Sequence, residues 1–496
     1  MWIWRQRYRA FRRLREAVTL WYHPSYSMRH LHNQASRVAL ERGELVIGRL
    51  ASRGLVRPGD IRPSPSISIS ELARVHSLSY LESLVVPNVL GRIFGIDAGT
   101  IPIDATLEAQ RRAVGGTLAA TRSVTYGPWR VAINLGGGMH HAHREQGAGF
   151  CAYNDVAVAI TELRQQGFSD PIAVVDLDFH QGDGTETIFA EDSSVFTYSL
   201  HGSTWQTIDA KASLNVELPP GTGDDAYLKE LEKSLAPLLR RVRPRLVFYI
   251  AGNDVLTRDA LGDFALSPAG VLQRDQSVLR WSDEVRAKVI VTLGGGYSEA
   301  AWASTADLVR FTLTGYANSS PDSAPVLERH YREIARSLDP TALQREHDPF
   351  VLTEADIMGD LARETQPRLI MGYYTAQGIE LALERYGFLD AIRERGFGEL
   401  RLKTEATDGQ RQRLRIFGTK PEYSADELLV VELVVVRRRL EAPPPLEAVE
   451  TLYVEWLMMQ NPTLVFDRSR PRLPGQRFPG LGLADETLEM LKRVCV

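Results

Sequence analysis

The sequence predicts an α/β fold in which helices cover a central parallel sheet. Between about residues 129 and 300, short apolar runs alternate with helical patterns. Such nearly continuous apolar runs are typical of strands whose two faces are both buried. Glycines or polar residues follow each run directly, and open α/β sheets bind their ligands beyond the carboxyl ends of strands. We therefore expect an open sheet with a functional site at the carboxyl ends of its strands.

Five strands are predicted in this region, and a distinctive segment follows each of them. The strands cover residues 130–135, 172–175, 195–200, 246–251 and 289–293. In the same order they lead into the segments GGGMHH, DLDFHQGDG, HGSTW, GND and GGGYS. The helical patterns between them are expected to pack on the two faces of the sheet. We expect the five strand ends to converge on one site.

The chain is too long for one ordinary domain and is expected to divide into three parts. Residues 1–21 form a basic and aromatic segment with a helical pattern, which packs on its own protein or lies on a membrane surface. Residues 22–340 hold the predicted sheet. Residues 346–496 have enough material for a small α+β domain, with a helical stretch near 372–395 and strand-like runs near 398–404, 412–418 and 427–437.

Composition excludes several classes of protein. With 44% hydrophobic and 24% charged residues, the 496-residue chain is neither disordered nor fibrous. The formal net charge of -4 argues against direct binding of nucleic acid. The two cysteines supply no disulfide framework, and no transmembrane run or secretory signal is evident, so we expect a cytoplasmic protein. The scarcity of lysine beside arginine indicates a GC-rich bacterial genome.

Three ligand-type residues follow the second predicted strand at intervals of two. In an extended chain this spacing points Asp176, Asp178 and His180 to one side. Burying two carboxylates side by side is costly unless a cation neutralises them, which favours a metal. Carboxylate and imidazole groups suit zinc, and a catalytic zinc site needs a third protein ligand. Asp254, after the fourth strand, is the candidate, although a lone aspartate there is more often a helix cap or a turn residue.

Two adjacent histidines, His140 and His141, follow three glycines at the end of the first strand. The glycines let the backbone come close to a ligand, which favours a catalytic role over a coincidence of surface composition. Asp176 and Asp183 are candidates to orient the two imidazoles. Tyr297 follows three glycines at the fifth strand end, where a phenol either packs in the core or donates a hydrogen bond to a developing oxyanion.

Together these segments resemble the zinc-dependent histone deacetylase family, and most closely its class IV branch. The resemblance covers roughly residues 22–320 and rests on seven ordered motifs: VGGTLAATR, INLGGGMHHAHREQGAGFCAYNDVAVAI, VVDLDFHQGDGTETIF, SLHG, LPPGTGDDAYL, AGNDVLTRDALGDFALSPAGVLQRD and TLGGGYS. It implies a three-layer arginase/deacetylase-like fold with a central parallel sheet.

The resemblance implies two bound cations. The zinc ligands would be Asp178, His180 and Asp254. The ligands of a structural potassium ion would be Asp176, Asp178, His180, Ser199 and the carbonyl oxygen of Leu200.

The resemblance also implies the catalytic roles. His141 would serve as general base and then as general acid, with His140 as its electrostatic partner. Asp176 and Asp183 would support the histidine pair, and Tyr297 would donate to the tetrahedral oxyanion. The residues lining the acyl-lysine channel would be Gly149 and Phe150.

Two features depart from the family pattern. The early HPExPxR-type segment is not evident, so the rim of the substrate site is unassigned. Gln181 stands where many members have a second histidine, as expected of class IV. The channel wall opposite Phe150 is unassigned, with Trp205 as a candidate.

The implied reaction is metal-assisted hydrolysis of the amide of an acyl-lysine in a protein, with an acetyl or a longer acyl group. The alternatives are an amidohydrolase of a small acylated amine such as acetylpolyamine, an arginase-like ureohydrolase with two manganese ions, and an acyl-lysine binding protein without catalysis. The GND segment lacks the DxD pattern that would hold a second ion. The intact ligands and histidine pair favour catalysis over binding alone. The oligomeric state is left open.

The tail from about residue 346 lies outside this resemblance. In its last part, Arg477, Gly480 and Gly482 precede a helical pattern. This arrangement is loosely similar to the loop with which GNAT-family acetyltransferases hold coenzyme A, because backbone N–H groups at a helix N-terminus suit an anion. The default interpretation is a structural or partner-binding domain.

Overall fold

The structure is a computed structural model. It describes residues 2–28, 31, 42–98, 101–298, 300–316, 324–339, 393, 398–408, 411–419, 428–437 and 452–457.

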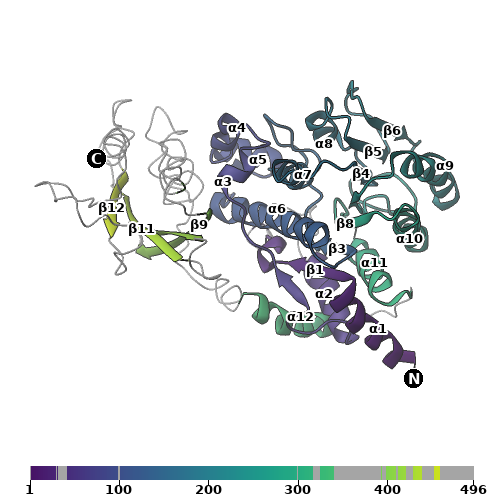
Figure 1. Ribbon diagram of the computed structural model, residues 1–496, viewed down its shortest axis with the longest axis horizontal. Coiled ribbons are helices and arrows are strands. Elements are labelled where there is room, and N and C mark those ends of the chain that lie inside the picture. Colours follow the sequence, from purple (N-terminus) through teal and green to yellow (C-terminus); the bar gives the residue numbers. More distant parts are fainter. Residues whose placement is uncertain are drawn as a thin grey trace, which may run out of the picture.

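An eight-stranded sheet forms the centre of the fold, and all of its neighbouring strands run parallel. Its strand order is β2-β1-β3-β8-β7-β4-β5-β6 (Figure 1). The strands are β1 (Val18–Tyr22), β2 (Ile61–Pro63), β3 (Val131–Asn134), β4 (Ile172–Asp176), β5 (Val195–His201), β6 (Ser213–Glu217), β7 (Leu246–Ile250) and β8 (Lys288–Thr292). The five strands predicted from the apolar runs are β3, β4, β5, β7 and β8. They are contiguous in the sheet, which brings their carboxyl ends together.

Both faces of the sheet are buried, as the continuous apolar runs indicate. Along β4, Ile172 and Val174 belong to one hydrophobic cluster, whereas Ala173 and Val175 belong to another on the opposite face. The three strands that the sequence pattern did not indicate are β1, β2 and β6. Strand β2 is three residues long, and β6 is only partly buried, so neither has the apolar run of an inner strand.

Strand β1 lies inside the sheet, between β2 and β3. Its register pairs Val18 with Val131 and Leu20 with Ile133. The domain boundary expected between residues 21 and 22 therefore falls within a strand of the central sheet. The helix before it, α1 (Trp2–Glu16), packs on α11 (Ala301–Thr314), and Arg13 donates to the carbonyl of Thr312.

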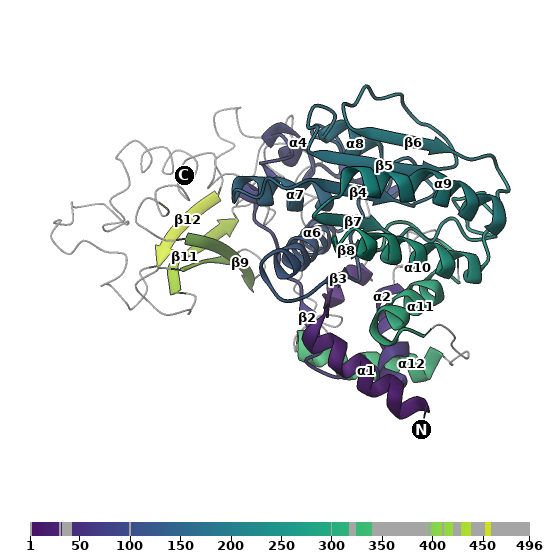
Figure 2. The same ribbon diagram turned by 45° about the vertical axis from the view of Figure 1, so that its right-hand side comes forward.

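Helices cover the two faces of the sheet as separate layers (Figures 1 and 2). One layer consists of α3 (Ile69–Leu72), α4 (Leu78–Ser83), α5 (Pro87–Phe94), α6 (Ile103–Tyr126) and α7 (Asp155–Gln165). The other consists of α1 and α11 with α2 (Arg42–Ser52), α9 (Asp224–Val242), α10 (Pro268–Glu284) and α12 (Ala324–Leu338). The short helices η1 (Pro24–Ser27) and α8 (Asp183–Ile188) follow β1 and β4.

Side-chain caps mark where several of these helices begin. Asn154 accepts a hydrogen bond from the backbone N–H of Ala157 at the start of α7, and Ser267 accepts one from Gly270 at the start of α10. Such caps satisfy N–H groups that have no partner inside the helix. Both helices therefore begin directly after loops that carry residues of the candidate site.

A buried arginine ties two strand ends together. Arg274, on α10, has no exposed surface and donates to the carbonyls of Leu177 at 3.1 Å and Gly252 at 2.5 Å. Its charge is balanced by Asp275, whose carboxylate accepts from Nε at 2.9 Å. Because Leu177 follows β4 and Gly252 follows β7, this one side chain fixes the spacing of the two loops that carry the predicted metal ligands.

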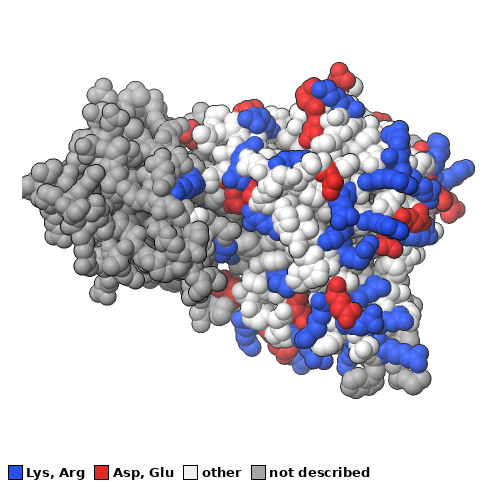
Figure 3. All heavy atoms as spheres, viewed as in Figure 1, with Lys and Arg blue, Asp and Glu red and all other residues white. Residues whose placement is uncertain are grey.

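Charges of both signs lie on the surface, and Lys and Arg gather over α9 and α10 on the face seen in Figure 3. Exposed arginines there include Arg240, Arg241 and Arg243. Acidic side chains lie among them, and Arg240 pairs with Glu284 at 3.0 Å. Among the described residues, no helix is both long and apolar enough to cross a membrane.

The described part of the tail is a four-stranded antiparallel sheet with the order β12-β11-β10-β9. Its strands are β9 (Gly398–Asp408), β10 (Arg411–Thr419), β11 (Leu428–Arg437) and β12 (Leu452–Leu457). The first three confirm the predicted strand-like runs. The helical stretch near 372–395, apart from Arg393, and the glycine segment with Arg477, Gly480 and Gly482 lie outside the described residues.

Candidate active site

The loops after β4 and β7 bring three predicted ligands into contact. Asp178, His180 and Asp254 each offer one ligand atom, and these atoms lie within 4.8 Å of one another. The Nδ1 atom of His180 is 3.2 Å from Oδ1 of Asp178 and 3.0 Å from Oδ2 of Asp254. The two aspartates are fully buried, whereas His180 is partly buried, with 16% of its side chain exposed. This arrangement is a three-residue cluster with the donor set expected of a catalytic zinc site.

Backbone N–H groups hold both carboxylates in place. Oδ2 of Asp178 accepts from the N–H of Gly295 at 2.5 Å, and Oδ1 of Asp254 accepts from the N–H of Phe179 at 2.9 Å. The other oxygen of each carboxylate faces His180. A Cβ atom at position 295 would lie 2.3 Å from Oδ2 of Asp254, so only glycine lets this loop close on the cluster.

The two buried carboxylates of the cluster need a positive charge beside them. Burial raises the pKa of Asp254, and the charge of Asp178 raises it further. Burial lowers the pKa of His180, but hydrogen bonds and charges of Asp178 and Asp254 outweigh this effect and raise the pKa to about 10. Without a metal, a proton on His180 thus supplies the positive charge that two adjacent buried carboxylates need. The residues present fit a divalent metal ion.

Metal binding at this cluster is expected to release protons. His180 is protonated at pH 7 in the metal-free protein because its pKa is about 10, whereas a metal ligand must be neutral. Between about pH 8 and pH 9, where Asp254 with its pKa of about 7 is already ionised, zinc binding should therefore release about one proton, and the affinity should rise about tenfold per pH unit. Near pH 7 the number of protons released should be higher, because Asp254 then contributes as well. Calorimetric titration of chelator-treated protein with zinc, in two buffers of different ionisation enthalpy, counts the protons. A count near zero at pH 7 would contradict this assignment.

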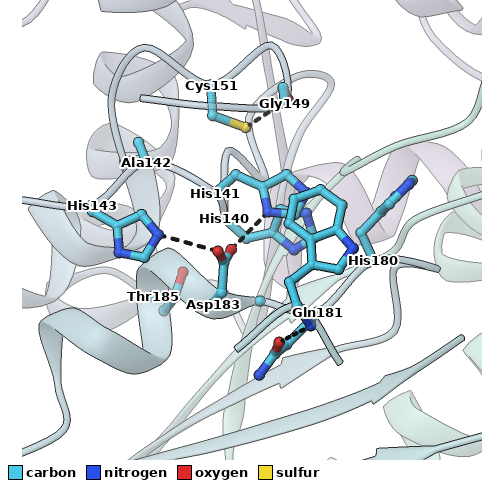
Figure 4. Close-up of polar contacts among 12 residues, drawn as sticks. His140, His141, Ala142, His143, Gly149, Cys151, His180, Gln181, Asp183 and Thr185 are labelled. Carbon is cyan, nitrogen blue, oxygen red and sulfur yellow. Dashed lines mark hydrogen bonds and ion pairs between the residues drawn. The ribbon is translucent and has the colours of Figure 1, made fainter. Parts of the chain in front are cut away.

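Two buried histidines lie beside the cluster, and each is bound to its own aspartate; the contact of His141 with Asp183 is drawn in Figure 4. Nδ1 of His140 is 2.7 Å from Oδ2 of Asp176, and Nδ1 of His141 is 2.7 Å from Oδ1 of Asp183. Because a carboxylate only accepts, each Nδ1 carries the proton. In a neutral His141, this tautomer leaves Nε2 able to accept a proton.

The two histidines differ in charge. Burial alone would lower the pKa of His140, but the charges of Asp176 and Asp178 outweigh it and raise the pKa to about 9. Burial and the charge of His140 lower the pKa of His141 to about 4. At pH 7 the pair therefore consists of a charged His140 and a neutral His141. A neutral imidazole is the form required of a general base.

Tyr297 lines the same cavity as His140, His141 and Asp178, which has a volume of about 150 Å³. Its ring lies 5.7 Å from that of Phe150, centroid to centroid. Burial raises the pKa of Tyr297 well above its usual value, and the charges of Asp178 and Asp254 raise it further. The phenol therefore stays protonated at neutral pH and can donate a hydrogen bond.

Gly149 and Phe150 also line the cavity. Both have positive φ angles, +53° and +65°. A Cβ atom on Gly149 would come within 2.3 Å of Cδ2 of His141. The left-handed turn at these two residues thus lets the backbone pass close to His141 and turns the phenyl ring toward Tyr297.

The residues assigned to potassium lie at the ends of β4 and β5. Asp176 and Ser199 are register partners across these strands. Oγ of Ser199 is 3.3 Å from the N–H of Gly182 and 2.9 Å from Nδ1 of His201, and Leu200 is the next residue of β5.

Comparison with known proteins identifies the family. The sequence model of the "Histone deacetylase domain" matches residues 37–312, more than half of the chain. This chain belongs to the histone deacetylase family. An uncharacterized protein of Picosynechococcus is 34% identical over 284 residues, which cover 56% of this chain and 91% of that protein. Histone deacetylase 2 of Arabidopsis thaliana is 32% identical over 269 residues, which cover 52% of this chain and 69% of that protein.

Solved structures share the fold of this histone deacetylase family member. A crystal structure of an HDAC homolog complexed with SAHA has 27% sequence identity and a TM-score of 0.52, and covers 67% of this chain and 92% of that chain. The HDA15 HD domain, at 21% identity and a TM-score of 0.50, is similar in fold. The predicted family and fold, a helix-covered parallel sheet, are therefore confirmed.

Sequence reasoning missed three residues that support the site of this deacetylase family member. Asp259 accepts from the N–H groups of Tyr297 and Ser298 at 2.7 and 2.8 Å, and so fixes the tyrosine loop. Asp155 accepts from the N–H groups of Gly138 and Met139 at 3.0 and 2.8 Å. All of these bonds cross between segments distant in sequence. Asp259 and Asp155 lie inside motifs shared with the family, and this was the only sequence feature that pointed to a role for them.

His143 is the third of these residues, and it gives Asp183 a second partner. Its Nε2 lies 3.1 Å from Oδ2 of Asp183, the oxygen that does not face His141 (Figure 4). The carbonyl of His143 lies 2.9 Å from Nδ1 of His76. Asp183 is thereby fixed at both oxygens, which sets the orientation of His141.

Proposed function

We propose that this member of the histone deacetylase family is a zinc-dependent lysine deacylase, which hydrolyses the amide of an acyl-lysine side chain in a protein. The observation that carries the proposal is one cavity lined by a neutral histidine, a protonated phenol and Asp178, which belongs to a metal-type cluster. Its family supports deacetylase chemistry in general. Zinc, the class IV branch and the structural potassium ion are parts of the same proposal.

The chain's own residues supply proton transfer and charge stabilisation. Asp178, His180 and Asp254 would hold a divalent ion, which would supply Lewis-acid activation of the carbonyl and of water. Nε2 of His141 accepts the proton of the attacking water and returns it to the leaving lysine amine. The phenol of Tyr297 donates to the oxyanion that develops as the carbonyl carbon becomes tetrahedral.

Asp183 and His140 prepare His141 for this task. Asp183 holds the Nδ1 proton of His141, which keeps Nε2 directed away from it. The charge of His140, fixed by Asp176, keeps His141 neutral until it takes the proton of water. Phe150 supplies an apolar wall for the aliphatic part of the lysine side chain.

A panel of substrates tests the proposal. Chelator-treated protein with added zinc is incubated with acetyl-, butyryl- and myristoyl-lysine peptides and with N-acetylputrescine, with and without a hydroxamate. We expect zinc-dependent, hydroxamate-sensitive release of the acyl group from at least one peptide. Release from N-acetylputrescine alone would assign a small-amine substrate instead, and no release from any substrate would overturn the deacylase proposal.

A further inference from the structure

Trp205, in the loop between β5 and β6, lies flat against His141. The two rings are 4.3 Å apart, centroid to centroid, and only 6° from parallel. The same indole meets the ring of His180 edge-on at 5.5 Å. Its side chain is nevertheless 49% exposed. Trp205 therefore stands between solvent and two central groups of the site, the base His141 and the ligand His180.

The side chain of Gln181 holds this loop by three hydrogen bonds to its backbone. Oε1 accepts from the N–H groups of Trp205 and Gln206 at 2.8 and 3.1 Å, and Nε2 donates to the carbonyl of Gln206 at 3.0 Å. Gln181 is fully buried. One amide thus satisfies three backbone groups of a loop that has no regular secondary structure.

The three hydrogen bonds of Gln181 form a clamp on the loop between β5 and β6. Just before this clamp, the loop runs beside Phe179 and His180. The N–H of Gly202 donates to the carbonyl of Phe179 at 2.9 Å, and His180 and Ser203 form a parallel bridge. Gln181 follows His180 directly, so the clamp and the metal ligand are one residue apart. Movement of the loop at Trp205 therefore requires the bonds to Gln181 to break.

Other hydrogen bonds hold the loop at residues on either side of Trp205. Thr204 donates to Oε2 of Glu217 through its N–H at 3.1 Å and through its hydroxyl at 2.6 Å. The side chain of Gln206 donates to Oγ1 of Thr187 at 3.1 Å. The bonds from Gln181, by contrast, include the backbone of Trp205 itself, so they set where the indole lies.

We propose that Gln181 is a positioning residue that acts through Trp205 and makes the indole a fixed wall of the substrate entrance above His141. The inference rests on the proposed deacylase function. It gives a role to Gln181, which stands where many family members have a second histidine. If the wall is already ordered before the substrate arrives, substrate binding does not incur the entropic cost of ordering it. Losing the clamp should therefore weaken substrate binding more than it slows the chemical step.

A double-mutant cycle tests whether Gln181 acts through Trp205. Gln181→Met keeps the length of the side chain and removes its hydrogen bonds. We expect it to lower kcat/KM by about tenfold, mostly through a higher KM, on the best substrate of the panel. In a Trp205→Ala background the same substitution should change kcat/KM by less than about twofold. An equal loss in both backgrounds would mean that Gln181 acts on something other than Trp205, and would overturn the proposal.

Gln206→Ala is the matched control, because it removes a side-chain hydrogen bond from the same loop and leaves the clamp intact. Its kcat/KM should stay within about twofold of the wild-type value; a loss as large as that of Gln181→Met would count against the clamp. If Gln181→Met does not fold, Gln181→Leu carries the same cycle, because it also removes the hydrogen bonds and adds no charge beside the buried Glu186. The same cancellation in the Trp205→Ala background is expected.

Hydrogen exchange provides a readout that does not depend on activity. In the zinc-loaded full chain, the backbone N–H groups of Trp205 and Gln206 should exchange faster in Gln181→Met than in the wild type or in Gln206→Ala. Mass spectrometry of peptides that span residues 203–206 measures this difference. Unchanged exchange would overturn the clamp. If the wild type releases no acyl group from any substrate, the deacylase proposal fails separately, and the exchange result still decides the clamp.

Discussion

A Tyr297→Phe variant is expected to lose about 10²- to 10³-fold in kcat while KM changes little. The substitution removes one hydroxyl, and the ring keeps its packing against Phe150. In the proposed mechanism the phenol donates to the oxyanion and not to the ground-state carbonyl, so the loss should fall on kcat. The measurement is steady-state kinetics on the best acyl-lysine peptide, together with the zinc content of the purified variant.

Tyr126→Phe is the matched control for this experiment. Tyr126 is 61% exposed, and its hydroxyl donates to Gln166 on the surface at 3.1 Å. Its loss should leave kcat within about twofold of the wild-type value because surface substitutions change little. Wild-type turnover in Tyr297→Phe, with zinc still bound, would remove the phenol from the mechanism.

An Asp254→Asn variant is expected to lose zinc-supported activity without losing stability in the metal-free state. Asparagine keeps an oxygen for the N–H of Phe179 and removes a carboxylate from the cluster. In the metal-free protein, burial and the charge of Asp178 disfavour the ionised form of Asp254. The neutral amide therefore relieves a cost in the metal-free fold and abolishes a ligand for the metal.

Thermal unfolding with and without zinc separates these two effects. For the wild type, zinc at about 100 times its Kd should add about 2.7 kcal/mol to the free energy of unfolding. For Asp254→Asn this increment should vanish, while the metal-free midpoint equals or exceeds that of the metal-free wild type. Asp263→Asn, an exposed change in the same loop, should keep the zinc increment. A full zinc increment in Asp254→Asn would show that Asp254 is not a ligand.

Five of the six inner strands could be predicted from sequence because both of their faces are buried; β1 is buried as well and was not detected. Burial on two faces produces an apolar run, as in β7, whose residues Leu246–Ile250 are all buried. Strand β6 is partly exposed on both faces, and β2 has only three residues, so neither has that signal. The pattern therefore predicts five contiguous strands and their carboxyl ends, and leaves β1 and the two outer strands undetected.

The chemistry of the site was predictable only in part. The spacing of Asp176, Asp178 and His180 predicts that their side chains gather on one side. It does not predict that Asp176 binds His140 while the other two meet Asp254. Apart from its place in a family motif, Asp259 carries no local signal, because its role depends on the backbone of Tyr297, which only folding brings near. Local patterns identify groups with chemistry, and tertiary contacts decide which group does what.

The hydrogen bonds that hold the two ligand carboxylates cross between loops. Asp254 is held by the N–H of Phe179, in the loop that carries Asp178, and Asp178 is held by Gly295, in the loop that carries Tyr297. No one of these loops can open without disturbing another. Release of an ion bound there would therefore require at least two of these loops to move together.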